Sequence, residues 1–107
     1  MAFFDTNALE VWERRPGWRG RFYRSEAMSF SHYDFSAGSW IHEHHHSNEE
    51  VWYVIAGELE VTVGAETHAV GPGGVAIVAP DQRHSVRALS DGRALIASHP
   101  PRADEPR

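Results

Sequence analysis

Residues 38–57 have the sequence GSWIHEHHHSNEEVWYVIAG, a histidine-rich segment followed by an apolar run. Four of the chain's eight histidines fall within residues 42–46. If residues 40–46 form a β-strand, alternate side chains share one face of that strand. The side chains predicted to share this face are Trp40, His42, His44 and His46.

The spacing of these histidines predicts a metal site. Imidazoles two residues apart on a strand, such as His44 and His46, can converge on one ion at roughly 2.0–2.1 Å, the usual metal–nitrogen distance. Further ligands must come from elsewhere, and the candidates are Glu50, which begins the next apolar segment, and His84, which precedes another. Because imidazole and carboxylate ligands suit Fe, Mn, Ni, Zn or Cu, we expect one divalent transition metal ion of undetermined identity.

Other interpretations of the same residues are open. The histidine tract could be a surface segment with only adventitious metal affinity. Residues 47–50, SNEE, match a helix capping box, which would give Glu50 a structural role, although the β-branched and aromatic residues that follow favour a strand. His84 taken alone could be a structural histidine with satisfied hydrogen bonds.

Outside the histidine segment, the sequence pattern is typical of an all-β protein. From about residue 19 onward, glycine and proline interrupt the chain at short intervals, and the segments between them are rich in valine, isoleucine, threonine and aromatic residues. Short strands separated by turns on this spacing indicate a sandwich or a barrel. We expect helix only over residues 7–14, ended by Pro16-Gly17.

One of the expected strands is apolar on both faces. Residues 51–55, VWYVI, do not alternate, whereas residues 58–63, ELEVTV, alternate between polar and apolar. A strand that is apolar on both faces must be covered on both, by the barrel interior on one side and by another sheet or subunit on the other. We therefore expect a homodimer.

Composition narrows the possible partners. A length of 107 residues predicts one domain, and the absence of cysteine excludes disulfides, thiolate ligands and a cysteine nucleophile. The formal net charge of -5 argues against a nucleic-acid partner. One basic cluster either forms a positive rim for an anionic substrate or is simply solvated, and solvation is the commoner case. It comprises Arg14, Arg15, Arg19, Arg21 and Arg24.

The two ends of the chain carry no targeting or membrane pattern. The first residues lack the basic start and apolar run of a secretion signal, and no run of about 18 apolar residues occurs. We therefore expect a cytoplasmic protein with no membrane partner. Residues 99–107 are rich in proline and charge, and they predict a loose tail.

Two motifs in this chain resemble those of the cupin superfamily. The first motif is Gly, five residues, His-x-His, three or four residues, Glu, six residues and Gly. Its fixed positions are met by Gly38, His44, His46, Glu50 and Gly57. The second motif resembles residues 73–84, which end at His84. This second match is looser, because other residues replace its usual proline, glycine and final asparagine; the replacements are Ala79, Asp81 and Ala88.

This resemblance implies a single-domain cupin β-barrel, of the jelly-roll or RmlC-like type, that binds a metal and often dimerises. We expect three segments: an N-terminal extension over 1–18, the cupin domain over 19–99 and a C-terminal tail over 100–107. The resemblance also implies a metal site made of His44, His46, Glu50 and His84. His42 lies outside the motif, and we expect it to support the ligands rather than bind the metal.

In overall appearance the chain is similar to the small cupins of pectin and alginate breakdown, which convert unsaturated uronates to linear keto acids. It departs from them at Ile96, where they carry an acidic residue, and at Glu50, where they usually carry glutamine. We therefore expect a metal-dependent enzyme that acts on a small polar or anionic molecule, as an isomerase of sugar acids or a dioxygenase. The alternative is a binding or sensor cupin with a structural metal.

Side chains other than the metal ligands are also predicted in the pocket. The residues expected to line it are His42, Trp40, Trp52 and Arg83. Trp40 and Trp52 share the parity of the ligands, although tryptophan in a barrel is at least as often plain core. The candidates for a catalytic role are His42, Arg83 and Arg102, and Arg102 could meet a substrate carboxylate.

Overall fold

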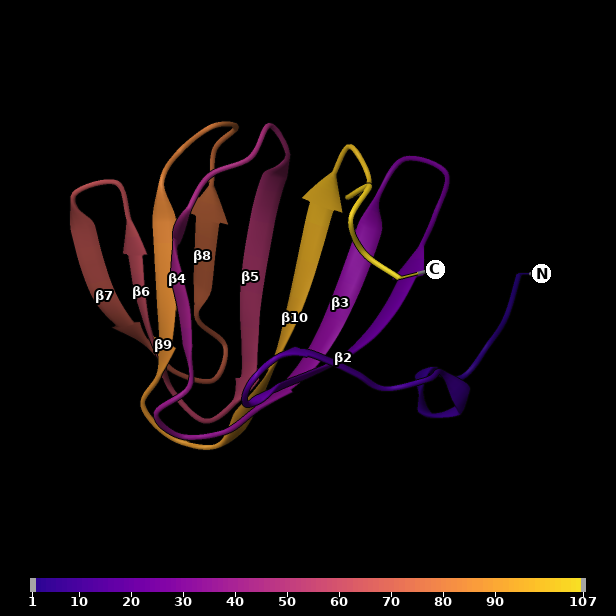
Figure 1. Cartoon of the computed structure of the whole chain (residues 1–107), viewed down its shortest axis with the longest axis horizontal. Helices are drawn as coiled ribbons and strands as arrows, with labels where there is room; N and C mark the ends of the chain where they lie inside the picture. The colour runs from indigo at the N-terminus through magenta and orange to yellow at the C-terminus, as the bar shows by residue number, and fades with distance from the viewer. Residues whose placement is uncertain (1, 107) are drawn as a thin grey trace.

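The structure, a computed structural model, describes residues 2–106 and consists almost entirely of strands (Figure 1). In chain order the strands are β1 (Trp12–Arg15), β2 (Trp18–Arg24), β3 (Ser29–Phe35), β4 (Trp40–His44), β5 (Glu49–Ala56), β6 (Leu59–Val63), β7 (Glu66–Val70), β8 (Val75–Val78), β9 (His84–Ala88) and β10 (Gly92–His99). No helix within residues 2–106 is long and apolar enough to cross a membrane.

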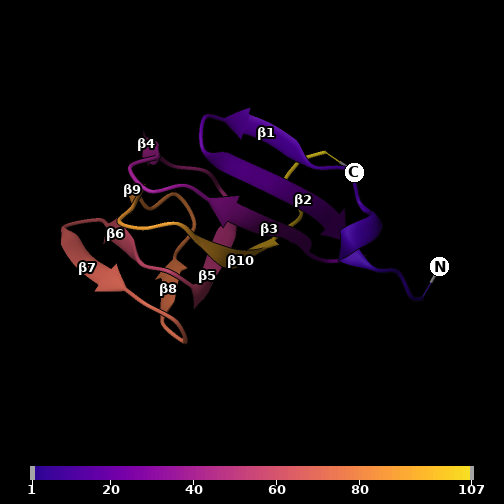
Figure 2. The same cartoon turned by 90° about the horizontal axis from the view of Figure 1, so that it is seen from below.

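The strands form two antiparallel sheets that face each other. One sheet has six strands in the order β1-β2-β3-β10-β5-β8, and the other has four in the order β4-β9-β6-β7. Figure 2 shows the two sheets curving around a common interior. The predicted all-β jelly-roll barrel is therefore confirmed.

Alternating burial builds the core between the sheets. In β3, every second residue from Ser29 to Phe35 is buried, and β10 alternates in the same way. The side chains of Trp18, Phe35, Val54, Leu59 and Val86 are almost completely buried. Such alternation is what a strand with one face on a core requires.

The N-terminal segment belongs to this core. Trp18 is only 1% exposed, and its ring packs edge-on against Trp52 at a centroid distance of 6.2 Å. A domain that starts at residue 19, as the sequence suggested, would leave out Trp18, which is part of the core. The helix predicted over 7–14 is also wrong: a 3-10 turn covers Thr6–Ala8, and residues 12–15 form β1. Pairing of β1 with β2 competes successfully with helix over this short segment.

Strand β4 contains a bulge that changes which residues face inward. Ile41 pairs with Val86 and His44 pairs with His84, so the β4 partner residues are three positions apart and the β9 partners two. The inserted residue reverses the parity of the strand. Ile41 therefore points inward and is buried, and His42 and Trp40 are exposed.

The C-terminal segment is packed against the barrel, so the prediction of a loose tail is wrong. It folds back after β10 beside β3 (Figure 1). Asn48 Nδ2 donates to the carbonyl of Pro100, and Arg102 N donates to Ser29 Oγ. Ser31 Oγ donates to Glu105 Oε2. The predicted boundaries also included Met1 and Arg107, which lie outside the described residues.

The outer face of β5 and β8 carries exposed apolar side chains, namely Tyr53, Ile55, Val75 and Ile77. Tyr53 lies opposite Val75, and Val51 lies opposite Ile77. Within residues 2–106 nothing covers this face, so the strand predicted to be covered on both sides is covered on one.

Candidate metal centre

Three histidines converge at one end of the barrel interior. The strand β4 ends at His44, β9 begins at His84, and His46 lies in the connection between β4 and β5. Their ligand nitrogens all lie within 4.8 Å of one another. The bulge in β4 produces this arrangement, because it turns His44 inward directly opposite His84.

Each of these imidazoles is oriented by a backbone carbonyl two residues away. Nδ1 of His44 lies 2.8 Å from the carbonyl of His42, and Nδ1 of His84 lies 2.9 Å from that of Gln82. Nδ1 of His46 lies 3.1 Å from the carbonyl of Asn48. Because a carbonyl only accepts hydrogen bonds, Nδ1 carries the proton and Nε2 keeps a free lone pair. Such outer contacts are the usual support of metal-binding histidines.

The donor set fits a transition metal. Nε2 of His46 and Nε2 of His84 are buried and have no hydrogen-bond partner within residues 2–106. Buried polar atoms normally have partners, so two unpartnered Nε2 atoms this close together are a donor set that fits a metal ion. Burial, together with the neighbouring His84, lowers the pKa of His44 despite the hydrogen bond to its ring, and this keeps the imidazole neutral for binding.

Glu50 borders the three-histidine group without belonging to it. Its side chain is almost fully buried, with Oε2 at 3.4 Å from His46 Nε2 and Oε1 at 3.5 Å from His84 Nε2. Burial raises the pKa of Glu50, but its polar neighbours, Trp52 Nε1 among them, lower it more, so the carboxyl group is ionised. Glu50 also receives hydrogen bonds from Trp52 Nε1 at 3.1 Å and Ser98 Oγ at 3.3 Å. The carboxylate can therefore approach a cation held by the histidines.

The remaining predicted residues divide between the pocket and the exterior. Trp52 and Arg102 line the cavity beside His44 and Glu50. Trp40 is 53% exposed and stacks on His42 outside the barrel, so the predicted place of Trp40 in the pocket is wrong. Arg83 is exposed and pairs with Glu43 at 3.3 Å, away from the cavity. The bulge in β4 explains why Trp40 points outward: strict alternation along the strand would place Trp40 on the face of His44, and the inserted residue places it on the opposite face.

The cavity is lined by residues that the sequence left unassigned. From the basic cluster, Arg14 and Arg15 line the cavity and are also exposed to solvent. Arg21 lies elsewhere and pairs with Asp34. Tyr33, Asp104 and Glu105 also line the cavity, and burial raises the pKa of Tyr33 to about 12. In β3, a polar residue at an inward position, such as Ser31, is the sequence feature that points to a polar cavity.

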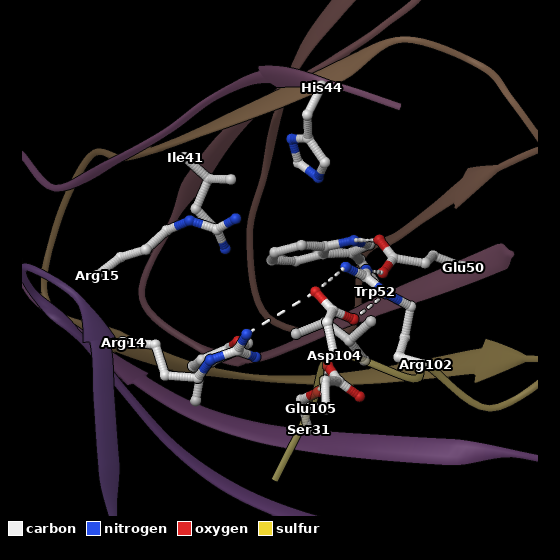
Figure 3. Close-up of a pocket in the computed structure, with 12 residues that line it drawn as sticks. Arg14, Arg15, Ser31, Ile41, His44, Glu50, Trp52, Arg102, Asp104 and Glu105 are labelled. Atoms are coloured by element: carbon white, nitrogen blue, oxygen red, sulfur yellow. Dashed lines mark hydrogen bonds and ion pairs between the residues drawn. The ribbon is translucent and has the colours of Figure 1, made fainter. Parts of the chain in front are cut away.

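Figure 3 shows the cavity with His44 at the top and Arg14, Arg102, Asp104 and Glu105 below it, while Arg15 extends from the left. The cavity volume is about 30 Å³, which holds one or two water molecules. Asp104 Oδ2 lies 2.9 Å from Arg102 Nη2 and 3.8 Å from Arg14 Nη2. Partial burial raises the pKa of Asp104, but Arg102 lowers it more, and the net shift is downward.

Comparison with known proteins identifies the family. Residues 31–99 match the family described as Cupin domain. An uncharacterized protein of Streptomyces coelicolor is 34% identical over 82 residues, covering 76% of this chain and 78% of that protein. Among solved structures, an RmlC-like cupin from Shewanella frigidimarina has a TM-score of 0.91 at 21% identity, covering 97% of this chain and 95% of its own.

A second solved structure, KdgF from a Halomonas species, has a TM-score of 0.90 at 21% identity and covers 97% of both chains. At 21% sequence identity, structural similarity shows that the fold is shared but does not assign an activity. The family match spans residues 31–99 of the 107-residue chain, more than half of it, and includes all four predicted ligands. The chain therefore belongs to the cupin domain family.

Proposed function

We propose that this cupin binds one divalent transition metal ion through His44, His46, His84 and Glu50 and acts as a metal-dependent enzyme on a small anionic substrate. The observation that carries the proposal is the pair of orphaned, buried Nε2 atoms beside a cavity that arginines line. An ion bound there would supply Lewis acidity or redox chemistry.

The side chains around the cavity have distinct chemical roles in this proposal. Arg14, Arg15 and Arg102 attract and orient an anion, since guanidinium groups bind carboxylates through paired hydrogen bonds. The hydroxyl of Tyr33 keeps its proton at neutral pH and can donate it to a substrate oxygen. The Trp52 ring forms an apolar wall, and its Nε1 holds the carboxylate of Glu50 in place.

A sugar acid is the substrate class that this arrangement favours. A carboxylate would complement the arginines, and hydroxyl or carbonyl oxygens would lie toward the histidines. The sequence similarity to uronate-converting cupins points the same way. This chain differs from those cupins in one acidic residue: Ile96 is buried in the cavity wall at the position where they carry an acid. Proton transfer would therefore depend on Tyr33 or on a carboxylate of the C-terminal segment.

A binding or sensor cupin without turnover is the second candidate. The observation that favours it is the small cavity of about 30 Å³, which excludes a sugar as it stands. In that case the ion would be structural, and the chain would bind its ligand only after the cavity opens.

Elemental analysis and an activity screen test the proposal together. The purified protein should contain about one equivalent of a transition metal. It should also consume unsaturated uronates, followed by loss of ultraviolet absorbance, or consume oxygen with a small acid. His46→Ala should abolish the activity. Metal without any turnover would favour the second candidate, and a protein that takes up no metal from supplemented medium would contradict both.

We also propose that two copies associate through the exposed apolar face of β5 and β8. Tyr53, Ile55, Val75 and Ile77 supply the apolar contact surface, and β8 is the last strand of its sheet. Apolar groups that cluster on one outer sheet face are typical of interfaces.

A further inference from the structure

Asp104 places the chain's own carboxylate among the arginines of the cavity. Its oxygens face the Arg102 guanidinium as a pair, with Oδ1 at 3.0 Å from Nε and Oδ2 at 2.9 Å from Nη2. Arg14 approaches the same carboxylate from β1 (Figure 3). Two parallel N–H···O contacts are the geometry by which arginine binds a free carboxylate. A substrate carboxylate bound at this point would make the same contacts.

Arg15, beside this pair, has no carboxylate partner within residues 2–106. It lines the same cavity, yet within residues 2–106 no carboxylate oxygen lies within 4.0 Å of it. Arg14 is also incompletely paired, because its contact with Asp104 is a long 3.8 Å. The arginines can therefore hold more negative charge than Asp104 provides.

The cavity admits a sugar-sized ligand only if a lining group moves. Its volume of about 30 Å³ holds one or two water molecules. Of the charged groups around it, Glu50 and Arg102 have side chains that are only 5% and 16% exposed, whereas that of Asp104 is 56% exposed. Asp104 is thus the carboxylate that water already reaches and that moves at the smallest cost.

The C-terminal segment can release the Asp104 side chain without detaching from the barrel. On one side, Asn48 holds the carbonyl of Pro100, and Arg24 holds that of Arg102. On the other side, Ser31 holds Glu105. Asp104 lies in a turn between these anchors, and its carboxylate pairs with Arg102 and Arg14.

We propose that Arg14, Arg15 and Arg102 form a carboxylate-binding subsite, and that Asp104 occupies it as an internal competitor that an anionic substrate displaces. The ligand class is a carboxylate on a small polar molecule, such as a sugar acid. This inference rests on the proposed function for its substrate class, but carboxylate binding is measured without turnover. Asp104 then raises the selectivity of the site, because a neutral sugar lacks the charge needed to displace it.

Binding of galacturonate to the metal-loaded full chain, followed by NMR titration, tests the inference, with galactose as the neutral probe. Asp104→Asn and Asp104→Ser remove the competitor, so galacturonate should bind about three- to fivefold more tightly to both, in line with a partly exposed ion pair. Galactose binding should not change. Adding Arg14→Gln to Asp104→Asn should weaken galacturonate binding by about threefold or more.

Glu58→Gln is the matched control, since Glu58 is an exposed acid in the turn between β5 and β6, and its loss changes net charge equally. At physiological ionic strength its effect should stay below about twofold, because charges beyond roughly 8 Å are screened. Unchanged or weaker galacturonate binding in both Asp104 variants would overturn the inference, as would no galacturonate binding by any variant. An equal gain in Glu58→Gln would overturn it as well.

The two proposals fail in distinguishable ways. Metal content and turnover of the unmodified chain test the proposed function alone. Tighter galacturonate binding in the Asp104 variants of a protein without turnover would uphold the subsite and reject the enzyme. Turnover with unchanged affinity in those variants would uphold the enzyme and reject the competitor.

Discussion

Arg102 Nη1 lies 2.9 Å from Glu50 Oε2, which joins the C-terminal segment to the carboxylate at the start of β5. The two residues are 52 positions apart in the chain, and both side chains are largely buried. Glu50 is also the acidic member of the predicted ligand set. The orientation of this carboxylate therefore depends on a segment that follows the last strand.

Replacing Arg102 with alanine should destabilise the protein. The change leaves the ionised, buried Glu50 without its closest cationic partner. Because Trp52 and Ser98 still donate to Glu50, the expected cost is about 1–3 kcal/mol, below the roughly 3–5 kcal/mol of a buried charge left wholly unpaired. Urea unfolding should show the loss. Arg83→Ala is the control, since Arg83 forms an exposed pair with Glu43 and should cost no more than about 0.5 kcal/mol. Equal losses in the two variants would contradict the role assigned to Arg102.

Replacing His46 with alanine should remove most of the bound metal and lower the thermal midpoint. The ion binds only the folded chain, so losing it removes stabilisation as well as a ligand. Elemental analysis and thermal unfolding with and without a chelator measure both effects. His42→Ala is the control, because His42 points outward and stacks on Trp40. Metal loss in His42→Ala equal to that in His46→Ala would argue against the placement of His42.

Asp34 should contribute a stability that disappears in acid. Partial burial raises the pKa of Asp34, but the hydrogen bond and charge of Arg93, followed by those of Arg21, lower it more. A carboxyl group with a lowered pKa in the folded state stabilises the protein above its unfolded pKa of about 4 and loses this effect as pH falls through the folded value.

Urea unfolding of the wild type and of Asp34→Asn at several pH values measures this contribution. The variant should be less stable at neutral pH by about 0.5–1.5 kcal/mol, and the difference should shrink below about pH 4. A difference that is independent of pH would show that the ion pairs of Asp34 with Arg93 and Arg21 do not matter.

Replacing Ile77 with lysine should convert a dimer to a monomer. Ile77 is 60% exposed on the apolar face, so a charge there costs the monomer little but would be buried in an interface. Light scattering after size-exclusion chromatography gives the mass of each species. Trp40→Lys is the control on the other sheet, where the mass should not change. A wild type that is monomeric at high concentration would reject the interface.

Much of the fold and of the site was predictable from local pattern. The spacing of His44, His46 and Glu50, the alternation of strand residues and the frequent turns depend only on neighbouring positions, since strand parity and turn chemistry are local properties. For that reason the all-β class, the grouping of His44 with His46 and the apolar outer surface of β5 were within reach of the sequence.

Tertiary structure decided the rest. The bulge that moves Trp40 and His42 outside depends on the pairing of β4 with β9, and no local pattern shows it. The ordered C-terminal segment owes its position to hydrogen bonds with Ser29, Ser31 and Asn48, which its own proline-rich sequence does not reveal. The contact of Arg102 with Glu50 likewise exists only because closure of the barrel brings distant segments together.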